Sequence, residues 1–164
     1  MIILPIFGGI EYKDNIGNEE FLHVEQIGIL KAFEELTIEI HNPYEKENVS
    51  YLEFEFQMEK QHFKNDFQQY KFDLSSHNKL NSLFEIENAF GFIGIYDGRK
   101  EGTFTLKNTN NGFFVFVING AFEIENRLLE AKDGLAISKT ETIKWESLSQ
   151  NATLLVIEIP LNSN

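Results

Sequence analysis

The residues best suited to metal chemistry in this chain are its four histidines, His23, His41, His62 and His77. A mononuclear non-haem iron site needs about three histidine or carboxylate side chains on one face, with open positions for oxygen or substrate. No two of these histidines form a His-x-His pair, which would place both imidazoles on the same face of a strand. The remaining combination is His23 and His41 with Glu39, although surface or hydrogen-bonded roles are the favoured interpretation of these histidines. No histidine follows Asn78, so the second half of the chain cannot hold a histidine-based metal site.

Carboxylates in pairs could serve acid–base chemistry. The pairs are Glu34 with Glu35, Glu53 with Glu55, and Glu123 with Glu125. Where the surrounding sequence alternates between apolar and polar residues, the glutamates fall on the polar positions, which face solvent in a half-buried strand. A solvated strand face is therefore the favoured interpretation.

A charged loop, DGRKEG at residues 97–102, separates two strand-like segments. Its glycines indicate a turn with unusual backbone angles. Because loops often carry function, Arg99 and Lys100 are the candidate contacts to an anion or a protein partner. A simple turn remains the favoured alternative.

The composition limits the classes of function. The 164 residues include 14 Lys and Arg against 26 Asp and Glu, which gives a net charge of −12. This balance argues against nucleic-acid binding, which needs clustered cations facing the phosphates. The chain has no cysteine, so disulfides and thiolate chemistry are excluded. The sequence shows neither a signal peptide nor a segment of membrane-spanning length, and we expect a cytoplasmic protein without membrane contact.

Strand patterns dominate the chain and predict an all-β fold. The clearest stretch combines the apolar run FFVFVI at residues 113–118, the alternating FEIEN at 122–126 and LAI at 135–137, with glycine turns between them. Residues 36–40 and 51–56 also alternate. The polar segment 57–70 is expected to be a connector.

These strands and turns resemble the pirin family, the bicupins that include quercetinase-like enzymes. The match covers residues 90–160 best, where YDGRKEG (96–102), LEAKDG (129–134) and LVIEIP (155–160) follow the family's C-terminal cupin in order. In the family, the motif that corresponds to LEAKDG usually has glycine at the position of Lys132. The resemblance implies a cupin-type jelly-roll β-barrel over residues 72–164, preceded by a partial cupin-like β unit with a connector over 1–71.

The first half of the chain is similar to the family more loosely, through EYKDNIGN at residues 11–18 and EIHNP at 39–43. In this register the histidine of the family's ligand motif falls on Ile38 and its glutamate on Ile40, while Asn42 and Pro43 are retained. The resemblance implies an N-terminal cupin that is truncated and has lost its mononuclear iron site.

A barrel without metal ligands can still enclose a small apolar ligand. Four aromatic residues on strands that would line the C-terminal barrel are the candidates for such a site: Phe104, Phe114, Phe116 and Phe122. The favoured alternative is a barrel filled by its own side chains.

Three functions follow as hypotheses. The first is a metal-free pirin-like binding or regulatory module without cofactor, and the second is a quercetinase-like dioxygenase with a rearranged iron site. The third is a structural subunit that docks onto another protein. A partial β unit leaves strand edges and an apolar face uncovered, so we expect a homodimer.

Overall fold

The chain is built from β-strands. The computed structural model describes residues 1–32, 35–56 and 65–161, and within them it has sixteen strands and no helix. It follows that no helix in these ranges could cross a membrane. His62 and Glu34, considered above, lie outside the described residues. The all-β expectation is confirmed.

The strands belong to two compact units, Met1–Phe72 and Asp73–Asn164. Unit 1 holds the strands β1 (Ile2–Phe7), β2 (Ile10–Asp14), β3 (Glu19–Leu22), β4 (Gln26–Lys31), β5 (Ile38–His41), β6 (Ser50–Phe54) and β7 (Asp66–Lys71). Unit 2 holds β8 (Asn81–Ile86), β9 (Ala89–Tyr96), β10 (Glu101–Thr105), β11 (Asn111–Asn119), β12 (Ala121–Ile124), β13 (Arg127–Glu130), β14 (Gly134–Ile137), β15 (Thr142–Ser147) and β16 (Ala152–Pro160).

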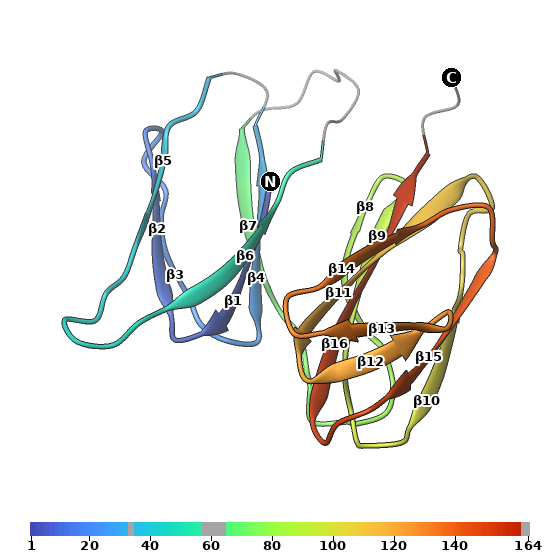
Figure 1. The fold of residues 1–164 in the computed structure, drawn as a ribbon. Coiled ribbons are helices and arrows are strands. Elements are labelled where there is room, and N and C mark those ends of the chain that lie inside the picture. The colour runs from blue at the N-terminus through green and yellow to red at the C-terminus, as the bar shows by residue number, and fades with distance from the viewer. Residues whose placement is uncertain (33–34, 57–64, 162–164) are drawn as a thin grey trace. The chain divides into compact units, whose positions relative to one another are not determined.

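Unit 1 has two layers (Figure 1). One is a four-stranded sheet in the order β6-β1-β4-β7, and the other is a three-stranded sheet in the order β3-β2-β5. The core of this unit contains the buried side chains of Ile3, Ile10, Tyr12, Leu22 and Leu30. Part of the expected connector is strand β7, which pairs with β4 in antiparallel register.

Asp14 holds the turn between β2 and β3. Its Oδ1 accepts hydrogen bonds from the backbone N–H groups of Ile16 and Asn18, at 3.1 and 2.9 Å. Its Oδ2 accepts the hydroxyl proton of buried Tyr12 and the amide of Asn18, at 2.9 and 2.7 Å. Burial alone would raise the pKa of Asp14, but the combined hydrogen bonds hold it below its ordinary value. The carboxylate therefore ties the turn to the core through Tyr12.

Unit 2 is a jelly roll of two sheets, with strand orders β10-β15-β12-β13 and β14-β11-β16-β9-β8. All its strand pairs are antiparallel, and β16 pairs with both β11 and β9 at the centre of the larger sheet. Alternate residues point inward, so each strand contributes every second side chain to one core.

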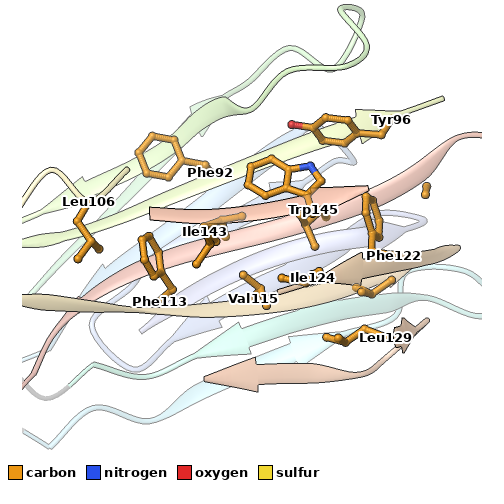
Figure 2. Close-up of a cluster of buried hydrophobic side chains, with 14 residues drawn as sticks. Phe92, Tyr96, Leu106, Phe113, Val115, Phe122, Ile124, Leu129, Ile143 and Trp145 are labelled. Atoms are coloured by element: carbon orange, nitrogen blue, oxygen red, sulfur yellow. The ribbon is translucent and has the colours of Figure 1, made fainter. Parts of the chain in front are cut away.

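The core of unit 2 is aromatic (Figure 2). One end gathers Phe92, Phe113 and Leu106, and the other gathers Tyr96, Phe122 and Trp145. The ring of Tyr96 meets the rings of Phe122 and Trp145 edge-on, with centroids 6.0 and 5.8 Å apart. Such edge-to-face pairs stabilise the core beyond the apolar area they bury.

Candidate functional site

Strand β5 presents isoleucine to the core of unit 1 where the resemblance places metal ligands. Ile38 and Ile40 are half-buried and pack against that core, and Ile40 lies opposite Tyr12 on β2. The alternate residues Glu39 and His41 are exposed on the other face. Alkyl side chains have no lone pair to donate, so neither isoleucine can bind a metal. The two positions therefore do not fit the iron site that the family implies.

Glu39 and His41 are a pair on the solvent face of β5, with Glu39 Oε2 and His41 Nε2 2.9 Å apart. His23 lies in the connection between β3 and β4, where its backbone N–H donates to Gln26 Oε1 at 2.6 Å and its ring packs on Phe21. It borders a shallow hollow of about 240 Å³. Across the described residues, no three histidine or carboxylate side chains converge into a group that could hold a metal. The structure thus does not gather His23, His41 and Glu39 into one site.

The aromatic candidates in unit 2 divide between the two faces of their sheets. Phe122 is fully buried in the core, and Phe104 packs against it beside Phe92, with ring centroids 4.5 Å apart. Phe114 and Phe116 alternate with the core residues of β11 and lie on its opposite face. Their expected place inside the barrel is therefore corrected. Phe104 and Phe122 are inward as expected. They are joined by Phe92, Tyr96, Phe113 and Trp145, which were not among the candidates from the sequence.

Buried side chains pack closely around the inward candidate rings of unit 2. Trp145 lies across Gly102 on the neighbouring strand, so closely that a Cβ on this glycine would lie 2.4 Å from Trp145 Cε2. Burial raises the pKa of Tyr96 to about 12, so its hydroxyl is protonated at neutral pH. The inward aromatic side chains are thus neutral and mostly apolar, and they can pack against one another or against an apolar ligand.

The charged loop at residues 97–102 is fixed by Asp97. This carboxylate accepts hydrogen bonds from Asn78 Nδ2 at 2.8 Å and Gln150 Nε2 at 2.7 Å, and its Oδ1 lies 3.0 Å from His77 Nδ1. The hydrogen bond from Asn78, and then that from His77, lower the pKa of Asp97. Three separate segments of unit 2 therefore meet at one carboxylate.

Beyond Asp97, the loop exposes its cations. Arg99 Nη1 donates to Glu146 Oε1 at 3.2 Å, yet the Arg99 side chain is 79% exposed. Its backbone is held by the N–H of Arg99 bonded to the carbonyl of Ser147. Arg99 and Lys100 are thus exposed cationic side chains on a turn whose backbone is hydrogen-bonded.

Beside this loop, the outer face of three strands forms a hollow of about 590 Å³. Glu101, Glu146 and Glu123 line it from β10, β15 and β12, directly opposite one another in the strand register. Glu123 and Glu125 thus line this solvent-facing hollow. Like charges in neighbouring strands repel, and Arg99 offsets part of this repulsion through its bond to Glu146.

One buried carboxylate could not be identified as such from the sequence. Glu158, on β16, is fully buried, and its carboxylate accepts three hydrogen bonds from the segment between β10 and β11 and from Asn111. A single glutamate in an apolar strand does not by itself reveal its burial, because the partners come from about 50 residues away in the chain.

Known proteins resemble this chain in sequence and in fold. The model of the family described as "Quercetinase C-terminal cupin domain" matches residues 74–159, which is more than half of the chain. None of the curated proteins compared by sequence matches.

Among solved structures, YhhW from Escherichia coli superposes with a TM-score of 0.87 at 16% identity, over 99% of this chain and 73% of that chain. A structure of the same bacterial pirin in complex with nickel(II) gives 0.82 at 15% identity, over 97% and 71%. Quercetin 2,3-dioxygenase from Acinetobacter baumannii gives 0.78 at 14% identity, over 98% of this chain and 59% of that chain. At these identities the likeness establishes the fold.

Proposed function

The chain belongs to the pirin family of cupins, and we propose that it is a metal-free member that serves as a cytoplasmic binding or regulatory module. The observation that carries this proposal is the pair Ile38 and Ile40. Both face the core of unit 1 at the positions where the family resemblance places a histidine and a glutamate. With alkyl groups there, this face of β5 offers packing surface instead of ligand atoms.

The surface proposed for binding is the charged loop of unit 2. Asp97 and the bond between Arg99 N–H and the Ser147 carbonyl fix its backbone, so little conformational entropy is lost when a partner docks. The exposed cations of Arg99 and Lys100 would contact acidic groups of a protein partner or an anion, and Arg99 would then exchange or share its bond to Glu146. A small apolar ligand in the aromatic interior of unit 2 is the second proposed guest.

Catalysis is tested by oxygen uptake. With quercetin as substrate and added Fe²⁺ or Ni²⁺, we expect the protein to consume oxygen no faster than the metal and quercetin alone. The alternative is a quercetinase-like dioxygenase with a rearranged iron site, in which Glu39 and His41, 2.9 Å apart on β5, would be two of the ligands. Protein-dependent uptake that disappears in His41→Ala, but persists in His77→Ala, would establish that alternative and refute the metal-free proposal.

We also propose that the protein is a homodimer. Strand β13 lies at the edge of its sheet and exposes Leu128 by 66%, and such an edge favours pairing with a second copy. Light scattering at micromolar concentration is expected to give twice the chain mass of 19.0 kDa. The double variant Arg99→Glu/Lys100→Glu is expected to stay dimeric, because its loop is assigned to a different partner. A monomeric wild-type protein would contradict the homodimer. A dimeric wild type with a monomeric double variant would instead show that the charged loop contributes to the dimer interface.

A further inference from the structure

The segment between β10 and β11, residues 106–110, lies across one end of the unit 2 core and is called the strap here. Leu106 is buried in that core, at the end where Phe92 and Phe113 lie (Figure 2). The ammonium of Lys107 lies over the ring of Phe90, 4.3 Å from its centroid, and over that of Phe92 at 5.2 Å. The strap thus covers aromatic side chains that would otherwise meet solvent.

The buried carboxylate of Glu158 holds the strap through hydrogen bonds to its backbone. Glu158 Oε2 accepts the backbone N–H of Lys107 at 2.9 Å, and Oε1 accepts that of Asn108 at 2.8 Å. Oε1 also accepts the Asn111 amide at 2.9 Å, and the same amide donates to the Asn88 carbonyl. The neighbouring asparagines are neutral. The charged groups next to the strap are Lys107 and Glu85 on β8, whose side chains lie 3.7 Å apart.

The acceptor that holds the strap can therefore be switched by a proton. Hydrogen bonds to an ionised carboxylate are about twice as strong as those between neutral groups. A proton on Oε2 would remove the acceptor of the Lys107 N–H and point a new donor toward it. The neighbouring strand pairing does not depend on this carboxylate, since β11 and β16 are joined by their own backbone ladder.

We propose that Glu158 is a proton-sensitive latch for the strap. Ionised, it keeps residues 106–110 closed over Phe90 and Phe92. Protonated, it releases the strap while the sheets stay paired, and the aromatic end of the unit 2 core becomes accessible. This device goes beyond the metal-free binding function and does not depend on it.

Amide hydrogen exchange measured by NMR tests the latch. As the pH is lowered from about 7.5 until the carbon chemical shift of the Glu158 side-chain carboxyl reports its protonation, protection of the Lys107 and Asn108 amides, corrected for intrinsic exchange, is expected to fall by about tenfold or more. Protection of Val115 and Val156, which face each other in the β11–β16 ladder, is expected to persist. Binding of the apolar dye 8-anilinonaphthalene-1-sulfonate is expected to rise over the same pH range.

The variant Glu158→Gln is expected to show low protection of Lys107 and Asn108 at neutral pH, and Glu123→Gln, an exposed carboxylate of the same unit, is the control. If Glu158→Gln does not fold, the pH series on the wild-type protein still tests whether Glu158 is the latch. The latch is refuted if the strap and the β11–β16 ladder lose protection together. It is equally refuted if the strap amides stay protected throughout the pH series.

Discussion

Replacing Phe122 with alanine is expected to lower the free energy of unfolding by about 3–5 kcal/mol, the usual cost of emptying a fully buried phenylalanine site. Phe122 has no exposed surface and its ring meets that of Tyr96. The surrounding rings are held by both sheets and cannot collapse into the space without disturbing strand pairing. Denaturant unfolding followed by the fluorescence of Trp145, the single tryptophan of the chain, measures the loss in the same core.

Glu123→Ala is the matched control for this experiment. Glu123 is the next residue of the same strand, but its side chain is exposed on the solvent face, so its removal is expected to change stability by less than about 0.5 kcal/mol. If the two variants unfolded at the same denaturant concentration, the interior of unit 2 would not be the packed core described above.

Gly94→Ala is expected to destabilise the protein by about 1–3 kcal/mol through overpacking. A Cβ at this position would lie 2.4 Å from the carbonyl oxygen of Lys79 and 2.8 Å from Tyr96 Cε2. The first of these atoms belongs to the backbone, which is anchored nearby by the hydrogen bond from Asn78 N–H to the Ile95 carbonyl. The added methyl group therefore has to displace a chain segment rather than a flexible side chain.

The control for this substitution is Gly98→Ala. The nearest atoms to a Cβ on Gly98 are 3.7 Å away, an ordinary contact distance. Thermal unfolding of the two variants is expected to separate them by several degrees, since about 1 kcal/mol moves the midpoint of a domain this size by about 2–8 °C. Equal midpoints would mean that the segment at Asn78 and Lys79 yields freely, contrary to its hydrogen bonding.

The β-rich fold was predictable because its signals are local. The apolar run at residues 113–118 and the alternation at 122–126 correspond to β11 and β12, and the glycine at 120 between them has the positive φ of 80° that a tight turn needs. Strand β7 was missed for the opposite reason. Its sequence DFQQYK is mostly polar because it is an edge strand, and Phe67 alone joins the core, stacked on Tyr12 with centroids 4.2 Å apart.

Side-chain direction was harder to predict than strand position. In FFVFVI every residue is apolar, so the pattern does not say which of two alternating sets faces inward. The structure turns Phe113, Val115 and Val117 inward and leaves Phe114 and Phe116 on the other face. Around β5 the alternation is clean, and Ile38 and Ile40 pack against the core as the pattern indicates.

The polar sites depend on contacts between distant parts of the chain. Asp97 gathers Asn78 and Gln150, and Glu158 gathers the strap and Asn111. Asp97 lies within the motif YDGRKEG and Glu158 within LVIEIP, but neither motif reveals the partners of its carboxylate, because each partner set forms only when the jelly roll closes. The charged loop could be identified from its residues, but not the contacts through which Asp97 holds it.

The central claim, a pirin-family cupin without a metal site, is tested most directly by the metal content of the protein. The measurement is elemental mass spectrometry on protein purified without chelators from cells supplied with iron, nickel and copper. Because Ile38 and Ile40 carry no ligand atoms, we expect each metal far below one equivalent per chain. Stoichiometric iron, nickel or copper that is lost in His41→Ala or His23→Ala, and kept in His77→Ala, would contradict the account.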